Sequence, residues 1–185
     1  LYAGRLYVGD DKGLYNDDNN DSAANLQGIT LQYASPASKL SGGAAYYHLN
    51  SIDFENVVTE GAKSAKLNNT DPYTNGKNDE KNADIWSANL GYNFDNTSRL
   101  FGAYAQNTKA DNLDKSWQVI YSYKGAQAPN KGTWGAYAAY RYLGSYTSIF
   151  GTEDAQVVGA KGWEVGANYA PFQNVLATAK YFNGK

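Results

Sequence analysis

Period-2 alternation of apolar and polar residues most constrains the fold of this 185-residue chain. In the stretch SANLGYNFDNTSRLFGAYAQN (Ser87–Asn107), Leu90, Tyr92 and Phe94 alternate with small or polar residues, and the pattern resumes after a short polar segment. Successive side chains of a strand point to opposite faces of the sheet. The stretch therefore predicts a β-hairpin with one apolar and one polar face.

Nine segments carry this pattern and predict an all-β chain. Most are about 9–12 residues long, which exceeds the globular average of about 5–6 and suits the roughly 9–11 residues of a membrane strand. They are Leu1–Gly9, Leu26–Ala34, Lys39–Leu49, Ala83–Phe94, Arg99–Asn107, Lys115–Lys124, Thr133–Leu143, a segment around Trp163–Tyr169 and a segment around Val175–Tyr181.

Long and short connections alternate between these segments. The longer ones are Asp10–Asn25, Asn50–Asn82, Thr108–Asp114 and Gly144–Gly162, and the shorter ones are Ser35–Ser38, Asp95–Ser98, Gly125–Gly132 and Pro171–Asn174. Antiparallel neighbours joined in this way place every long loop at one end, as outer-membrane barrels do with their extracellular loops and periplasmic turns. A sandwich with crossing connections has no reason to sort its loops. We therefore expect an antiparallel up-and-down transmembrane β-barrel of the outer-membrane porin type.

Aromatic residues, 15% of the chain, gather near the strand ends. Ordinary strand propensity would also enrich tyrosine and tryptophan, but it predicts no preference for the ends. A barrel that meets two headgroup layers carries two aromatic girdles. We predict lipid-interface positions for Trp86, Trp117, Trp134, Trp163, Tyr92, Tyr123, Tyr142 and Tyr169.

The opposite face is too polar for a dry core, because each buried polar group without a partner costs a few kcal/mol. We expect this face to line water. The predicted pore-lining residues are Arg5, Asn89, Gln118, Lys124, Arg141, Glu164 and Lys180. Rings of basic residues favour anions, so the hypothesis is a mild anion preference opposed by Glu164.

Composition excludes several other classes. The net charge of −2 gives no basic footprint for nucleic acid. The absence of cysteine leaves no disulfide framework or thiolate metal site. No apolar run approaches the roughly 18 residues of a membrane helix. The mean hydropathy of −0.62 is compatible with a barrel, whose two faces cancel in the average.

No catalytic, cofactor or metal site is predicted. His48, the single histidine, lies at a strand end without neighbouring ligands, and the acidic stretch Asp17–Asn25 lacks the spacing of a calcium loop. A glycoside hydrolase needs two carboxylates about 5–5.5 Å apart for retention, and only Glu164 is expected on the polar face. The alternative function is a secreted, soluble carbohydrate-binding β-sandwich with exposed tyrosine and tryptophan.

Three stretches carry a family resemblance: WSANLGYNFDNTSRLFGAYAQN, GITLQYASPASKLSGGAAYY and KGWEVGANYAPFQNVLATAKYFNGK. They resemble the C-terminal β-barrel of porins of diderm Firmicutes that carry a surface-layer-homology domain. The resemblance implies a passive diffusion channel for small hydrophilic solutes in the bacterial outer membrane, with outer-membrane lipid around it. It implies contact with cell-wall polymer only through an N-terminal domain that these residues do not include.

Nine strands are an odd number, whereas bacterial single-chain barrels have an even one. We therefore expect residues 1–185 to form one partial barrel that lacks the surface-layer-homology domain, early strands and a terminal strand. Further sequence or other copies of the chain would complete the barrel. The sequence does not choose between them, so a homo-oligomer stays open.

Overall fold

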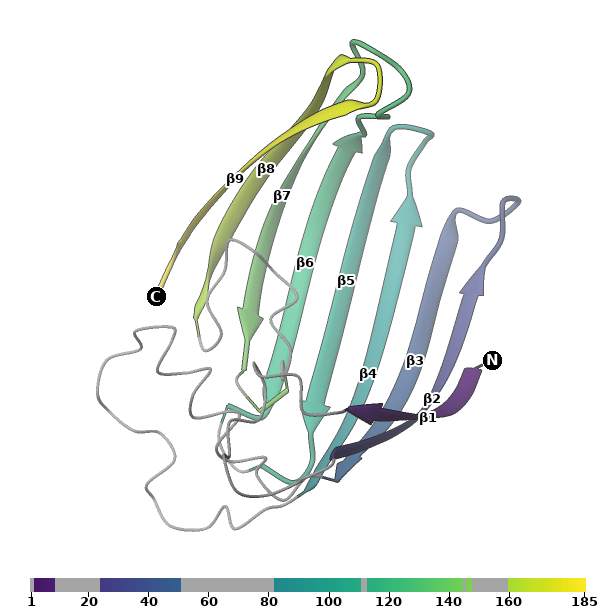
Figure 1. Ribbon diagram of the computed structural model, residues 1–185, viewed down its shortest axis with the longest axis vertical. Helices are drawn as coiled ribbons and strands as arrows, with labels where there is room; N and C mark the ends of the chain where they lie inside the picture. The colour runs from purple at the N-terminus through teal and green to yellow at the C-terminus, as the bar shows by residue number, and fades with distance from the viewer. Residues whose placement is uncertain (1, 9–23, 51–81, 111–112, 145, 148–159) are drawn as a thin grey trace.

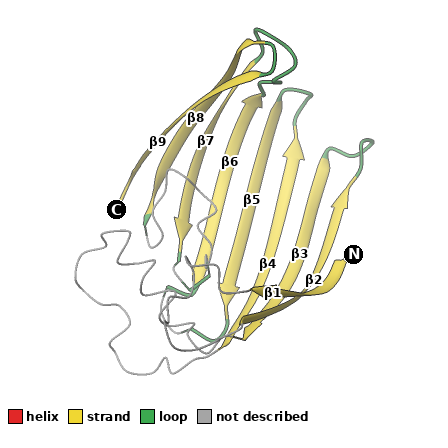
Figure 2. Ribbon diagram, viewed as in Figure 1, coloured by secondary structure: helices red, strands yellow, loops and turns green. Residues whose placement is uncertain are grey.

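The computed structural model describes residues 2–8, 24–50, 82–110, 113–144, 146–147 and 160–185. Within these ranges all regular secondary structure is β-strand (Figure 2). The strands are β1 (Tyr2–Val8), β2 (Ala24–Ala34), β3 (Leu40–Asn50), β4 (Asn82–Asn93), β5 (Ser98–Asn107), β6 (Lys115–Lys124), β7 (Trp134–Leu143), β8 (Lys161–Phe172) and β9 (Val175–Gly184).

The described strands form one antiparallel sheet, in which each strand pairs with its neighbour in the sequence from β1 to β9 (Figure 1). The sheet curves, and β1 and β9 are its two edges. The predicted all-β, antiparallel, up-and-down topology is confirmed. Closure into a barrel stays a prediction, because the sheet is open.

Alternation located the strands closely. Lys115–Lys124 was predicted with the bounds that β6 has, and β2 to β5 begin or end within two residues of the predicted segments. The last two strands are longer than the predicted segments. β8 continues to Phe172 through an irregular pairing near Pro171, and β9 continues to Gly184. The predicted long connections Asp10–Asn25 and Asn50–Asn82 lie largely outside the described residues, as does most of Gly144–Gly162.

The short connections gather at one end of the sheet, the upper end in Figure 1, which we call the turn end. Hydrogen bonds link adjacent turns there: the Asn174 amide donates to the Ala128 carbonyl at 2.6 Å, and the Gly132 amide donates to the Ala170 carbonyl at 2.8 Å. Asn174 has φ near 63°, which asparagine tolerates better than most residues. These bonds hold the β6–β7 and β8–β9 connections together.

A small apolar core lies at the opposite end, which we call the loop end. Leu49, Ala83, Ile85 and Tyr146 are buried there, and Leu26, Ala105, Ala110 and Leu113 pack against them. Leu49, Ala83 and Ile85 have the strand parity of the polar face. The prediction that this whole face is wet is therefore wrong at the loop end. Alternation identifies a face, but not the segment that covers it.

The β4–β5 turn is organised by one carboxylate. Asp95 Oδ1 accepts hydrogen bonds from the Thr97 hydroxyl and amide, both at 2.7 Å, and from the Ser98 amide at 2.8 Å. The Thr97 hydroxyl bond, followed by the Thr97 amide bond, lowers the pKa of Asp95. This arrangement is an Asx turn, which fixes the chain reversal between β4 and β5.

Replacing Asp95 with alanine should lower the thermal midpoint at pH 7. A carboxyl with a depressed folded-state pKa stabilises the fold above its unfolded-state pKa of about 3.9, and the contribution disappears as the pH falls through the folded value. The difference between wild type and Asp95→Ala should therefore narrow in acid. Asn96→Ala, in the same turn, is the control, and its effect should not depend on pH. A constant Asp95→Ala effect from pH 7 to pH 2 would contradict this assignment.

Candidate functional site

The cross-strand register sorts the side chains of the sheet onto two faces. Pairing aligns Leu31 with Ala44, Ala44 with Ala88, and Tyr92 with Leu100 on what we call the apolar face. Many large apolar side chains are exposed on it, including Leu31 at 60%, Leu90 at 61% and Trp163 at 61%. Residues of the opposite parity form the polar face, with Asn89, Asn93, Gln118 and Ser122 half-buried on it.

Aromatic side chains form two rows across the apolar face. The loop-end row consists of Trp86, Tyr104, Trp117, Tyr140 and Trp163. Its ring centroids are 5.2 Å apart for Trp86–Tyr104, 5.3 Å for Trp117–Tyr140 and 4.7 Å for Tyr140–Trp163. Tyr142 pairs with Trp117 at the same end. The turn-end row contains Tyr92, Tyr123, Trp134 and Tyr169.

The two rows keep a constant separation. Four strands have one aromatic residue in each row, six positions apart: Trp86 and Tyr92, Trp117 and Tyr123, Trp134 and Tyr140, Trp163 and Tyr169. Six positions span about 20 Å along a strand, which is of the order of the roughly 25 Å apolar band of a membrane barrel. Alanine, valine and leucine occupy most of the outward positions between the rows. The predicted lipid-interface aromatics thus lie on one face, in two rows.

Arg141 and Glu164 come together as a buried ion pair on the polar face. Arg141 Nη2 lies 3.5 Å from Glu164 Oε1, and the two side chains are 2% and 1% exposed. The Tyr137 hydroxyl donates to the same Glu164 oxygen at 2.5 Å. Sequence analysis predicted that both charged groups face water, and this is corrected here. The register makes the two residues diagonal neighbours, because Glu164 pairs with Ala139 and Arg141 pairs with Gly162.

The side chain of Lys124 does not lie on the polar face, where alternation predicts it. It pairs with Gly135 on the polar parity, but its φ of 55° places it in the left-handed region at the end of β6. Its ammonium lies 4.7 Å from the ring centroid of Trp134 and 5.4 Å from that of Tyr123. Both rings belong to the turn-end row of the apolar face. Lys124 is therefore not a pore-lining residue in this structure.

The remaining predicted pore residues divide by parity. Asn89 pairs with Gly43, Gln118 with Arg141, and Lys180 with Gly166, so all three belong to the polar face. Lys180 is exposed. Arg5 pairs with Gln27, whose parity is that of Ile29 and Leu31. The pore-lining role predicted for Arg5 stays a prediction.

Two tyrosines of the polar face were missed by sequence reasoning. The ring of Tyr137 lies against Gly166, its pairing partner on β8, where a Cβ atom would clash with it. The ring of Tyr47 likewise lies against its partner Gly28, and its hydroxyl is 3.1 Å from Thr30 Oγ1. Glycine inside a strand often marks such a close approach. The strand glycines were therefore the available signal, but they do not name the partner.

A polar cluster surrounds Asp84 at the loop end of the apolar face. Its Oδ1 lies 2.6 Å from His48 Nδ1 and accepts a hydrogen bond from the Tyr46 hydroxyl at 2.9 Å. Lys109 Nζ lies 3.7 Å from Oδ2. Sequence analysis placed His48 at a strand end without neighbouring ligands, whereas in the structure the Asp84 carboxylate is its partner. Within the described ranges, no three histidine, cysteine or acidic side chains gather as metal ligands.

Comparisons with known proteins do not assign the chain to a family. The chain matches no protein-family model, and no curated protein matches it significantly. Among the described residues, no helix is long and apolar enough to span a membrane. Any functional proposal therefore depends on the two faces of the sheet.

Removing Glu164 should destabilise the fold severely. Glu164→Ala removes the carboxylate that lies beside the buried Arg141 guanidinium, and removing one partner of a buried ion pair costs about 3–5 kcal/mol. Urea titration in detergent measures the free energy of unfolding, with Lys161→Ala on the exposed part of β8 as the control. Replacing both partners, Arg141→Met with Glu164→Met, should recover most of the loss. Equal effects of Glu164→Ala and Lys161→Ala would contradict the ion-pair assignment.

Proposed function

We propose that this chain is part of the wall of an outer-membrane β-barrel porin, which lets small hydrophilic solutes diffuse passively. The apolar face would contact lipid and the polar face would contact water. One observation carries the proposal: exposed apolar and aromatic side chains cover one face of the sheet from β2 to β9. Monomeric soluble proteins rarely expose contiguous apolar patches beyond a few hundred Å².

The two aromatic rows support the lipid assignment. Tyrosine and tryptophan gather at the headgroup level of both leaflets, with aliphatic residues between them. The apolar face has this arrangement, with Leu90, Val119 and Val165 between the rows and 49–61% exposed. The turn end would then face the periplasm and the loop end the outside.

The soluble carbohydrate-binding alternative receives less support. A β-sandwich covers the apolar face of one sheet with a second sheet. The nine described strands belong to a single sheet, and the apolar face carries exposed leucine and valine as well as aromatic rings. A glycan-binding surface would not need the aliphatic band.

Closure of the barrel requires partners for both edges of the sheet. The free sides of β1 and β9 would pair with strands from further sequence or from another copy of the chain, in keeping with the resemblance to porins with a surface-layer-homology domain. An edge strand in a bilayer needs such a partner, because its backbone groups find no water there.

Tryptophan fluorescence in liposomes tests the lipid contact. Trp86, Trp134 and Trp163 are 39–61% exposed on the apolar face. Lipids brominated at a shallow acyl position should quench them more strongly than lipids brominated near the chain end. Planar-bilayer recording on the same preparation should then show stepwise conductance. Soluble protein that resists quenching and binds glycans would favour the alternative and sink the porin proposal.

The charges that remain exposed on the polar face should set the ion preference of the channel. Arg99 and Lys180 are exposed there, whereas Arg141 is paired and buried. Lys180→Gln and Arg99→Gln should each shift the reversal potential in a KCl gradient toward cation preference, because basic pore residues favour anions. Lys131→Gln, in the β6–β7 connection, is the control. No shift with either polar-face variant would contradict the anion preference.

A further inference from the structure

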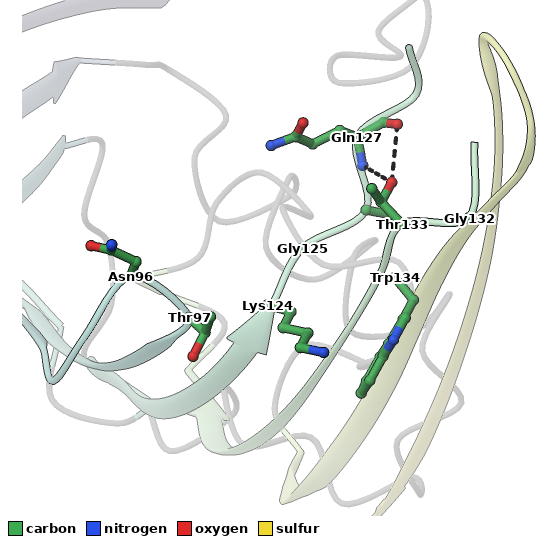
Figure 3. Close-up of a pocket in the computed structure, with 9 residues that line it drawn as sticks. Asn96, Thr97, Lys124, Gly125, Gln127, Gly132, Thr133 and Trp134 are labelled. Atoms are coloured by element: carbon green, nitrogen blue, oxygen red, sulfur yellow. Dashed lines mark hydrogen bonds between the residues drawn. The ribbon is translucent and has the colours of Figure 1, made fainter. Parts of the chain in front are cut away.

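A hollow of about 590 Å³ lies at the turn end of the sheet, between the β4–β5 turn and the β6–β7 connection (Figure 3). Asn96 and Thr97 line one side, and Lys124, Gln127, Thr133 and Trp134 line the other. These side chains supply one ammonium group, two amides and two hydroxyls. The ammonium group and the two side-chain amides are the groups that can donate hydrogen bonds into the hollow, because the two hydroxyls donate to Asp95 and to the Asn130 carbonyl.

The left-handed backbone of Lys124 changes the direction in which its side chain leaves the strand. A non-glycine residue in the left-handed region is uncommon, and such strain marks candidate functional positions. The Lys124 amide donates to the Thr97 carbonyl at 2.6 Å, which ties this conformation to the neighbouring turn. The side chain leaves the polar face and lies over the rings of Trp134 and Tyr123.

The β6–β7 connection forms a firm wall for the hollow. Thr133 Oγ1 accepts a hydrogen bond from the Gln127 amide at 2.8 Å and donates to the Asn130 carbonyl at 2.7 Å (Figure 3 shows the contacts between Thr133 and Gln127). Asn168 of β8 accepts a bond from the Ala126 amide at 2.9 Å. These bonds fix the connection that forms this wall of the hollow.

Lys124 is the one charged side chain among the residues that line the hollow. In the described part of the chain, no carboxylate forms an ion pair with Lys124. The acidic residue of the adjoining turn, Asp95, is occupied by Thr97 and Ser98. A second lysine, Lys131, lies 5.7 Å from the ring centroid of Phe172 in the same group of turns. An anion in the hollow would therefore meet the Lys124 ammonium and no carboxylate among the lining residues.

We propose that this hollow binds the phosphate of an anionic phospholipid headgroup in the leaflet at the turn end. The inference rests on the proposed membrane location, since Trp134 and Tyr123 belong to the aromatic row placed at the headgroup level. Lys124 would contact the phosphate oxygens, while the side-chain amides of Asn96 and Gln127 would offer hydrogen bonds. The aromatic rings would contact the first part of the acyl chains.

Native mass spectrometry from detergent micelles tests the site with dioleoyl phosphatidylglycerol and dioleoyl phosphatidylcholine. Wild type should retain the anionic lipid preferentially. Lys124→Asn removes the cation but suits the left-handed backbone, so the fold should survive. It should weaken phosphatidylglycerol binding about fivefold, as expected for one basic residue near an anionic surface. Lys115→Asn at the loop end is the matched control and should bind as wild type does.

The outcomes separate this inference from the proposed function. Protein that inserts into liposomes but retains both lipids equally would overturn the lipid site alone, as would unchanged binding by Lys124→Asn. Inorganic phosphate or glycerol 3-phosphate that displaces the lipid at similar concentrations would show a free-phosphate site instead. Protein that neither inserts nor conducts would overturn the porin proposal first. Weakening of phosphatidylglycerol binding by salt would support an electrostatic contact.

Discussion

The register between neighbouring strands is the constraint on which the rest of this structure depends. Seven consecutive antiparallel pairings keep apolar positions opposite apolar positions from β2 to β9, and a slip of one residue in any pair would turn a whole strand over. Short turns fix the register locally. Asp95 does so between β4 and β5, and Asn174 does so between β8 and β9, where its amide also bonds to the next turn. Both faces of the sheet follow from these pairings.

The two faces have opposite solvation requirements. Leu90 and Trp163 are more than half exposed, and water is a poor solvent for an unbroken surface of such side chains. The polar face, by contrast, includes buried charged groups. The Glu164 carboxylate is paired with Arg141 and accepts a hydrogen bond from the Tyr137 hydroxyl. A sheet in bulk water would be expected to bury the first face and expose the second. This inversion is typical of a membrane wall, and it is the physical content of the porin proposal.

The sequence predicted most of the fold because period-2 alternation and turn chemistry are local signals. The bounds of β6, the antiparallel order and the aromatic rows all follow from them. What it could not predict depends on neighbours in space. Alternation placed Arg141 on the polar face but could not show that Glu164, two pairing positions away on β8, would meet it out of water. Alternation assigned Lys124 to the pore because no local sequence signal indicates a left-handed backbone at the end of β6.

These differences change how charge is distributed across the sheet. Alternation alone put Arg5, Lys124, Arg141 and Lys180 on one wet face, opposed by a single Glu164. In the structure, Arg141 is paired with Glu164, and the Lys124 ammonium lies against the aromatic row. The exposed cations of the polar face are then Arg99 near the turn end and Lys180 on the edge strand β9, within the described residues. Because Coulomb interactions between exposed charges fade within about 10 Å at moderate salt, two separated cations produce a weak and local field. A channel built on this face would therefore select solutes mainly by width, with charge as a minor correction.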